Sequence, residues 1–133
     1  MTTITCAYQG ELRCIAKHGP SGTDLLTDAP TDNQGKGESF SPTDLVATAL
    51  VSCILTIMGI VADRHGIDLG PCDARVEKTM TSGGERRIEL LEGWITLPPG
   101  LEDKQRRMLM RAAEGCPVKR SLEGATPIRL HWL

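Results

Sequence analysis

The longest feature in the pattern of hydrophobic and polar positions is an apolar run near the middle of the chain. Residues 45–62 contain no charged side chain, and a run of this length is too long for an ordinary strand. Ser41 can cap a helix, Pro42 suits a first helical position, and Asp44 can complete a capping box. The pattern therefore predicts a helix from Pro42 to about residue 65, ended by Gly66.

Shorter segments on both sides of this helix alternate apolar and polar residues, as strands do. They lie at residues 4–16 (two short strands), 25–27, 74–80, 87–97 and 126–132. Residues 101–114 repeat apolar positions at helical spacing up to Gly115, and a short turn begins at Pro117. We expect one α+β domain over residues 1–133, in which an antiparallel sheet surrounds a long central helix.

The first two strands are expected to form a hairpin around Gln9-Gly10, because glycine tolerates the positive φ of a tight turn. A two-residue turn would set Cys6 opposite Arg13. Cys14 would then point to the other face of the sheet, because side chains alternate along a strand. This register disfavours a Cys6–Cys14 disulfide.

The central helix is long enough to cross a membrane, but its surroundings favour a buried soluble helix. Thr48, Ser52, Thr56 and Gly59 interrupt the apolar run, no aromatic belt flanks it, and the neighbouring segments alternate like soluble strands. These residues and Asp63 form one small or polar stripe, which would let a second helix approach. Because so small a domain can hardly enclose a long apolar helix alone, we predict an obligate homodimer and no membrane partner.

Composition argues against nucleic-acid binding and indicates the cellular compartment. The formal net charge is -2 and only four residues are aromatic, so neither a basic stripe nor stacking platforms are available to nucleic acid. The five cysteines are an odd number, and no secretory signal pattern opens the chain. These features predict a cytoplasmic protein with reduced thiols.

Cys53 lies in the middle of the apolar helix and is the first candidate for chemistry. A buried cysteine is more often an inert packing residue, and burial alone raises the pKa of a thiol. A reactive Cys53 would need a cation close to it. Arg13 is the preferred candidate, with Lys17 and Lys36 as others, although each could equally be a solvated surface charge.

Cys116 directly precedes Pro117, where the first backbone N–H groups of a helical turn would favour a thiolate. It could also simply cap and pack that turn. The chain has no closely spaced metal-ligand motif, serine-hydrolase motif or phosphate-binding glycine loop. Cys6, Cys14 and Cys72 are expected to be structural or incidental.

Taken together, three segments resemble the OsmC/Ohr family. They are Ser-Phe-Ser-Pro-Thr-Asp-Leu at residues 39–45, the apolar helix that carries Cys53, and Cys-Pro-Val-Lys-Arg-Ser-Leu at residues 116–122. The order of elements agrees over nearly the whole chain. The resemblance implies an intertwined homodimer with two long helices at its centre and active sites at the subunit interface.

For activity, the resemblance implies that the Cys53 thiolate attacks a peroxide oxygen and that Cys116 condenses with the resulting sulfenic acid. A dithiol, lipoylated or thioredoxin-like, would then reduce the disulfide. No metal, haem or flavin is implied. Family hydroperoxide reductases carry a glutamate that orients an arginine; this chain has Thr43 at that position, so Asp44 is the carried-over carboxylate and Arg13 the carried-over arginine.

These observations favour a peroxidase that reduces organic or fatty-acid hydroperoxides in oxidative-stress defence. One alternative is a non-catalytic dimer that binds an apolar ligand at the subunit interface, favoured by the missing glutamate and the apolar helix wall. Another is a redox sensor whose cysteines oxidise without useful turnover. The pattern at residues 41–45 is closer to the OsmC-like branch than to Ohr proper.

Overall fold

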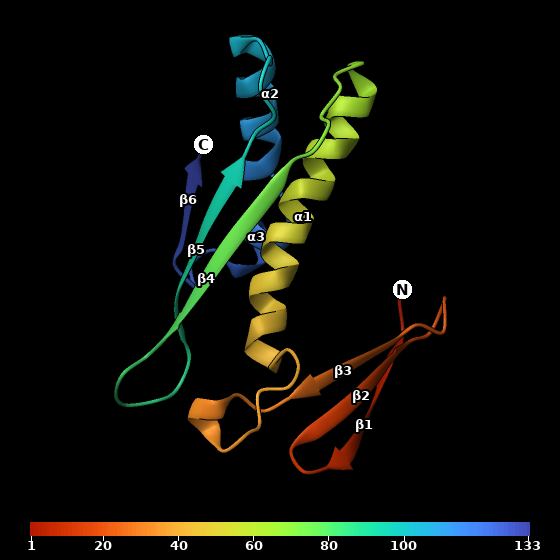
Figure 1. The fold of residues 1–133 in the computed structure, drawn as a ribbon, viewed down its shortest axis with the longest axis vertical. Coiled ribbons are helices and arrows are strands. Elements are labelled where there is room, and N and C mark those ends of the chain that lie inside the picture. Colours follow the sequence, from red (N-terminus) through yellow and green to blue (C-terminus); the bar gives the residue numbers. More distant parts are fainter. The chain divides into compact units, whose positions relative to one another are not determined.

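The computed structural model describes all 133 residues, and Figure 1 shows the ribbon. Contacts within the chain define two compact units, residues 1–46 and 47–133, and each is described by itself. In chain order the elements are β1 (Ile4–Gly10), β2 (Arg13–His18), β3 (Asp24–Asp28), a 3-10 turn (Thr31–Asn33), α1 (Pro42–Arg64), β4 (Asp73–Met80), β5 (Ile88–Thr96), α2 (Asp103–Glu114), α3 (Pro117–Leu122) and β6 (Ile128–Trp132). The predicted α+β class is confirmed. The prediction of one domain over the whole chain stays a prediction.

In the first unit, β1, β2 and β3 form an antiparallel sheet in that order. The predicted hairpin register is wrong: Cys6 lies opposite Ala16, and Cys14 lies opposite Tyr8. The turn falls later than expected because Glu11 and Leu12 adopt positive φ values of 55° and 65°, which non-glycine residues rarely do. Cys6 and Cys14 therefore share one face of the sheet.

The start and end of α1 are as predicted. The Asp44 backbone N–H donates to Ser41 Oγ at 3.1 Å, and the Ser41 backbone N–H donates to Asp44 Oδ2 at 2.9 Å. This reciprocal capping box satisfies donors that the first turn leaves without helical partners. After Arg64 the chain turns at Gly66, whose φ is 63°.

In the second unit, β4, β5 and β6 form a mixed sheet rather than a purely antiparallel one. β4 pairs antiparallel with β5, whereas β6 pairs parallel with β5. A parallel neighbour requires a crossover connection, and α2 and α3 supply it between β5 and β6. The core of this unit is built from α1, β5 and α2, and its fully buried apolar side chains include Leu50, Ile54, Met58, Leu91, Ile95 and Leu109.

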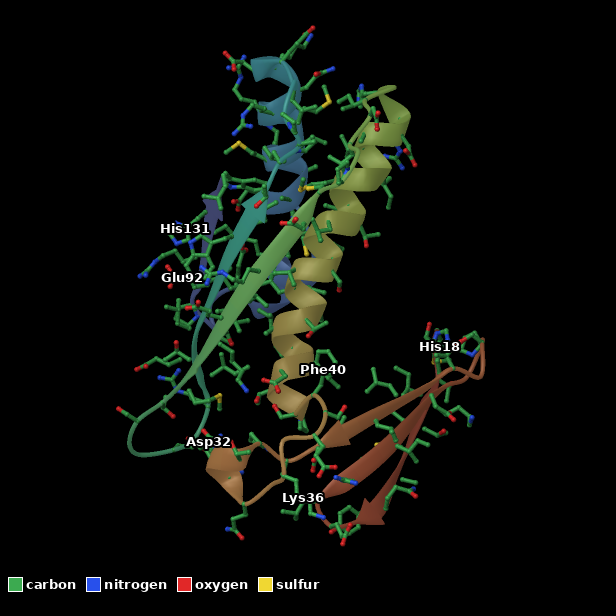
Figure 2. All side chains as sticks on the ribbon, viewed as in Figure 1. His18, Asp32, Lys36, Phe40, Glu92 and His131 are labelled. Carbon is green, nitrogen blue, oxygen red and sulfur yellow. The ribbon has the colours of Figure 1, made fainter.

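Figure 1 shows β4 and β5 running alongside the part of α1 that belongs to this unit. Gly93 of β5 faces the helix, since a Cβ added there would lie 3.7 Å from Cγ1 of Val51. The opposite face of the sheet carries polar side chains. Figure 2 shows Glu92 and His131 as neighbours, and Oε1 of Glu92 lies 2.7 Å from Nε2 of His131. The imidazole of His131 also stacks on Trp94. One face of the sheet thus packs on α1 and the other carries a polar and aromatic cluster.

By length and composition alone, α1 could also cross a membrane. Its buried residues recur at helical spacing on one side: Ala47, Leu50, Ile54, Met58 and Ala62. The other side includes the exposed residues Ser52, Thr56, Ile60 and Asp63. Ser52, Thr56 and Asp63 belong to the stripe predicted to accept a second helix, and all three are exposed in a single chain.

Gly35 is required by the loop between β3 and α1. A Cβ added at Gly35 would overlap the backbone oxygen of Ala29, and the Gly35 N–H donates to the Pro30 carbonyl at 2.9 Å. We expect Gly35→Ala to lower the free energy of unfolding by about 2 kcal/mol or more, because backbone must move to relieve the overlap. Urea unfolding measures this effect. Gly83→Ala is the control, since a Cβ at Gly83 meets no atom within 4 Å, and an equal loss in both variants would contradict the argument.

Candidate functional site

The second unit brings Cys53 and Cys116 together from distant parts of the sequence. Cys53 is half-buried in the middle of α1, and Cys116 is fully buried at the N-cap of α3. The two thiols lie close enough to interact, and the interaction with Cys53 raises the pKa of the Cys116 thiol. Cys116 Sγ also accepts a hydrogen bond from the backbone N–H of Lys119 at 3.4 Å. A thiol on the core helix therefore lies beside a second thiol that is held by the first turn of α3.

Burial raises the pKa of Cys116, and its interaction with Cys53 raises it further. The backbone N–H groups of Lys119 and Val118 act in the opposite direction. The expectation that the helix start would favour a Cys116 thiolate is therefore wrong for the net effect, because desolvation outweighs the backbone donors. Cys116 is held as a protonated thiol next to Cys53.

This raised pKa has a consequence for stability at alkaline pH. The folded protein holds the Cys116 proton more tightly than the unfolded chain does. The resulting contribution to the free energy of unfolding is fully present below the unfolded thiol pKa of about 8.5. It is lost as the pH rises through the higher pKa of the folded state. We expect Cys116→Ala to lose less free energy of unfolding between neutral and alkaline pH than wild type does. Urea titrations at both pH values measure the difference, and equal pH dependence in the two proteins would refute it.

Lys119 lies close to Cys116, but its charge is already paired. Its ammonium is 2.8 Å from Glu114 Oε2 and 2.6 Å from Glu123 Oε1, and its side chain is 14% exposed. The hydrogen bonds that the ammonium donates to these two carboxylates raise the pKa of Lys119. Lys119 therefore fixes α3 and the end of α2 around Cys116, and its backbone rather than its ammonium contacts the sulfur.

In the first unit, Arg13 lies between two carboxylates that sequence reasoning did not identify. Its guanidinium is hydrogen-bonded to Glu38 and lies 3.6 Å from Asp28 Oδ2. Glu38 is the main cause of the raised pKa of Arg13, and Asp28 adds to it. The three side chains line a cavity of about 170 Å³ together with Leu26, Thr27 and Ser39.

Asp28 is the unusual member of this group because its side chain is only 1% exposed. Oδ2 accepts a hydrogen bond from the Glu38 N–H at 2.9 Å, whereas Oδ1 has no hydrogen-bond partner. A buried carboxylate is costly unless it is compensated, and here the compensation comes from Arg13 and the loop backbone. The available sequence signal was an aspartate at the end of a short apolar strand, directly before Ala29-Pro30.

Asp44 serves the capping box of α1, as described above, and Ser41 Oγ lies 3.2 Å from Thr43 Oγ1. The role of Asp44 as the carboxylate that orients Arg13 stays a prediction. Asp28 and Glu38 are carboxylates that contact Arg13 in the structure. Arg13 belongs to the first unit and the two reactive-cysteine candidates to the second, so its role toward Cys53 also stays a prediction.

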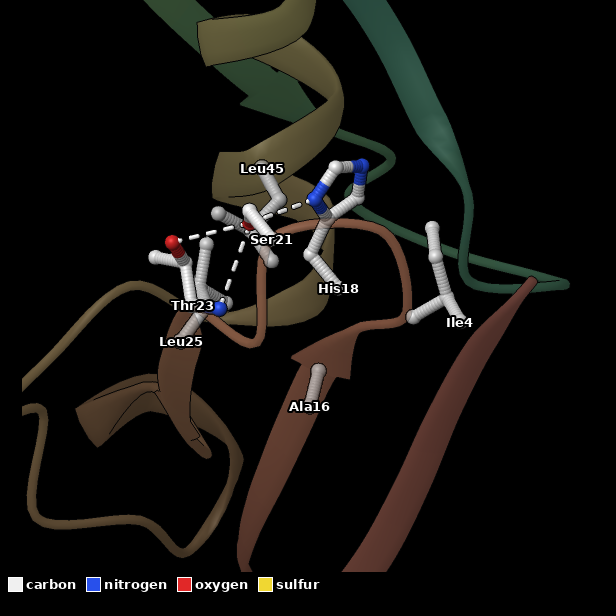
Figure 3. Close-up of a pocket in the computed structure, with 7 residues that line it drawn as sticks. All are labelled: Ile4, Ala16, His18, Ser21, Thr23, Leu25 and Leu45. Carbon is white, nitrogen blue, oxygen red and sulfur yellow. Dashed lines mark hydrogen bonds between the residues drawn. The ribbon is translucent and has the colours of Figure 1, made fainter. Parts of the chain in front are cut away.

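One cavity of the first unit is lined mostly by apolar side chains. It has a volume of about 540 Å³ and is lined by Ile4, Ala16, His18, Ser21, Thr23, Leu25 and Leu45. Figure 3 shows His18 and Ser21 at this cavity, with Nδ1 and Oγ 2.6 Å apart. No cysteine lines it, and no group of three or more His, Cys, Asp or Glu side chains in the structure is arranged to hold a metal ion.

Comparison with known proteins identifies one family, and solved structures of similar fold agree with it. The family model described as OsmC-like protein matches residues 35–131. A Psychrobacter arcticus crystal structure, provisionally named an osmotic stress induced and detoxification response protein, is 43% identical with a TM-score of 0.92 and covers 100% of this chain and 96% of its own. No curated protein matches the chain.

Two more distant crystal structures share the fold. One is an organic hydroperoxide resistance protein of Legionella pneumophila, also described as a predicted redox protein: it is 18% identical, has a TM-score of 0.78 and covers 99% of this chain and 96% of its own. The other is the organic hydroperoxide resistance protein OhrB of Bacillus subtilis, which is 15% identical, has a TM-score of 0.71 and covers 100% and 98%. These matches identify α1 as the core helix of a soluble fold rather than a membrane span.

Proposed function

This chain belongs to the OsmC-like protein family, and we propose on that premise that it is a thiol-dependent peroxidase of organic hydroperoxides. The observation that carries the proposal is that Cys53 and Cys116, far apart in the sequence, lie close enough for their thiols to interact. Neighbours of the same fold that are named for organic hydroperoxide resistance support the substrate class. Fatty-acid hydroperoxides suit the apolar residues around Cys53, and the proposed setting is oxidative-stress defence in the cytoplasm.

In the proposed reaction the Cys53 thiolate attacks the outer oxygen of the hydroperoxide. An S–O bond forms, the O–O bond breaks, and the alkoxide takes a proton to leave as an alcohol. Cys116 then gives up its proton and attacks the Cys53 sulfur, so an S–S bond forms and water leaves. An external dithiol, lipoylated or thioredoxin-like, reduces this disulfide and is itself oxidised.

The position of Cys116 supports the resolving role rather than the attacking one. It is fully buried, whereas Cys53 is partly accessible, so the peroxide reaches Cys53 first. The protonated Cys116 thiol lies beside Cys53, so it is the proposed partner for a sulfenic acid that forms on Cys53. Arg13 is proposed as the cation that favours the Cys53 thiolate, and Asp44 as a carboxylate that assists Arg13.

A homodimer is part of the proposal. Ser52, Thr56, Ile60 and Asp63 lie exposed along one side of α1, and small side chains allow two helices to approach closely. Ile4, Tyr8 and Leu25 are exposed on one face of the first sheet. A second copy would cover such apolar surface, which a stable monomer rarely leaves open.

The function is tested by steady-state consumption of an organic hydroperoxide with dihydrolipoamide or thioredoxin as reductant. We expect turnover with either dithiol and little turnover with a monothiol, because a dithiol clears the mixed disulfide by its own second thiol. The absence of turnover with every dithiol would contradict the proposal. Hydrogen peroxide serves as the comparison substrate.

Asp28→Asn tests whether the buried carboxylate positions Arg13. Asparagine keeps an acceptor for the Glu38 N–H but removes the charge near the guanidinium, so we expect kcat/KM to fall by about tenfold, or ~1.4 kcal/mol. Arg13→Met should lower kcat/KM at least as much, and the double variant should lose no more than Arg13→Met alone. Additive losses would mean that Asp28 acts independently of Arg13, and circular dichroism checks that each variant is folded.

The second candidate function is binding of an apolar ligand without turnover. The observation that favours it is the cavity of about 540 Å³ in the first unit, whose lining is mostly apolar. A fatty acid should then bind equally well to wild type and to Cys53→Ser. The remaining candidate, a redox sensor, predicts stoichiometric oxidation of the cysteines without sustained consumption of hydroperoxide.

A further inference from the structure

One ion-pair bridge spans the short segment that carries Cys116. The Lys119 ammonium lies 2.8 Å from Oε2 of Glu114, the last residue of α2, and 2.6 Å from Oε1 of Glu123, the C-cap residue of α3. The Lys119 side chain is only 14% exposed, whereas both glutamate side chains are more than half exposed. A largely buried cation thus ties the helix before Cys116 to the end of the helix after it.

Apart from the buried Cys116 at its start, α3 has few contacts that hold it in place. It is a helix of six residues, Pro117–Leu122, and none of them is buried. A helix of this length is not stable by itself in water, and a segment with little buried surface opens or shifts readily. The ion-pair bridge is therefore a main constraint on the position of α3.

The residue that makes the bridge also contacts the Cys116 sulfur through its backbone. The Lys119 N–H donates to Cys116 Sγ at 3.4 Å, and the Arg120 N–H donates to the Cys116 carbonyl at 3.0 Å. A shift of α3 therefore moves Sγ relative to Cys53. Such a shift matters because displacing a reacting group by about 1 Å can cost ~100-fold in rate.

The pKa shifts within the bridge agree with formed ion pairs. The pKa of Lys119 is raised, first by Glu114 and then by Glu123, and the pKa of Glu123 is lowered by Lys119. Lys119 therefore stays charged at neutral pH and cannot accept the Cys116 proton. Its side chain acts on Cys116 through position and not through proton transfer.

We propose that the Glu114–Lys119–Glu123 bridge positions Cys116 for condensation with the Cys53 sulfenic acid, and so sets the rate of disulfide formation without affecting the attack on hydroperoxide. This inference rests on the proposed function, because it concerns the second step of that reaction. In this step the Cys116 thiol loses its proton, its sulfur attacks the Cys53 sulfur, an S–S bond forms and an S–O bond breaks. The hydroxide that leaves takes the proton and becomes water. Lys119 is thus a positioning residue and not a catalytic one.

Lys119→Met tests the bridge in a single turnover. Wild type and variant are mixed with one equivalent of an organic hydroperoxide and quenched with acid at increasing times, and peptide mapping follows the disulfide while a peroxide assay follows the first step. We expect hydroperoxide consumption to stay within about twofold of wild type and the Cys53–Cys116 disulfide to form about tenfold more slowly. A 1,3-diketone should then trap more sulfenic acid in the variant. An unchanged rate of disulfide formation, or equal slowing of both steps, would overturn the proposal.

Two further variants separate position from charge. Lys119→Arg keeps a cation that can pair with both carboxylates, so it should restore most of the wild-type rate of disulfide formation. Glu114→Gln/Glu123→Gln removes both ion pairs but leaves the cation near Cys116. This variant should slow disulfide formation as Lys119→Met does, whereas faster formation would mean that the positive charge acts on the thiol and would overturn the proposal. Because both glutamates are exposed, it also decides the question if Lys119→Met does not fold.

Arg75→Met is the matched control, since it removes another ion pair of the second unit, in which Arg75 lies 2.9 Å from Glu77. It should change neither step. Amide hydrogen exchange adds a readout that needs no hydroperoxide: residues 117–122 should exchange faster in Lys119→Met than in wild type, and residues 103–109 should not change. A wild-type protein that forms no Cys53–Cys116 disulfide would refute the proposed function, whereas unchanged exchange at residues 117–122 would refute the role of the bridge by itself.

Discussion

Replacing Cys53 with serine should lower the rate of organic hydroperoxide consumption by at least about a thousandfold. The proposed reaction begins with attack by a thiolate, and a serine hydroxyl has no neighbouring base in the proposed mechanism to activate it. The rate is measured with a dithiol reductant in excess, so that reduction of the enzyme does not limit turnover. The loss should appear in kcat and in kcat/KM alike, because the nucleophile itself is removed.

Cys72→Ser is the control for this experiment. Cys72 is half-buried and its thiol donates to the Thr96 carbonyl at 3.2 Å, a bond that a serine hydroxyl can replace. The control should keep the wild-type rate. If Cys53→Ser consumed hydroperoxide as fast as Cys72→Ser, Cys53 would not be the nucleophile and the proposed mechanism would be wrong.

The second large effect is expected for Cys116→Ser. The first reaction with hydroperoxide should proceed, because Cys53 is intact, but no thiol contacts the sulfenic acid that forms. Sustained turnover with a dithiol should fall by about a hundredfold, while one equivalent of hydroperoxide is still consumed. A 1,3-diketone should trap the product on Cys53, and the intact mass should show one added oxygen before trapping.

The combined behaviour of the two variants separates attack from resolution. Loss of the first equivalent in Cys116→Ser would mean that Cys116 attacks the peroxide, and unchanged turnover would mean that a thiol outside the pair resolves Cys53. Cys116→Ala should behave like Cys116→Ser, since the missing group in both is the sulfur. A serine at this position keeps the acceptor for the Lys119 N–H, which limits any effect on α3.

The sequence predicts local structure well where adjacent residues determine it. The capping residues Ser41 and Asp44, the uncharged run and Gly66 define α1, and the structure places the helix at Pro42–Arg64. The hairpin β4–β5 and the positions of α2 and β6 were likewise predicted to within a few residues. Each of these elements carries its own boundary signal, so long-range packing is not needed to find it.

The sequence does not predict features that depend on unusual backbone or on distant contacts. The β1–β2 register depended on positive φ at Glu11 and Leu12, where glycine would have been the expected residue. The parallel pairing of β6 depended on how α2 and α3 return the chain to β5. Burial of Asp28 beside Arg13 depended on the loop that follows β3.

For the candidate site, the resemblance paired Cys53 with Cys116 and the structure brings the two side chains together. The raised pKa of Cys116 could not be predicted, because it results from complete burial outweighing nearby N–H groups. Cysteine position alone did not distinguish a reactive thiol from an inert one. The roles of Arg13 and Asp44 rest on the resemblance, and Arg13→Met tests the first of them.

The most direct test of the account is peptide mapping of the wild-type protein, alkylated at short times after one equivalent of an organic hydroperoxide. The account predicts that a Cys53–Cys116 disulfide forms within the first turnover, while Cys72 remains a free thiol. Slow oxidation scattered over the five cysteines, with no enrichment of that link, would contradict it.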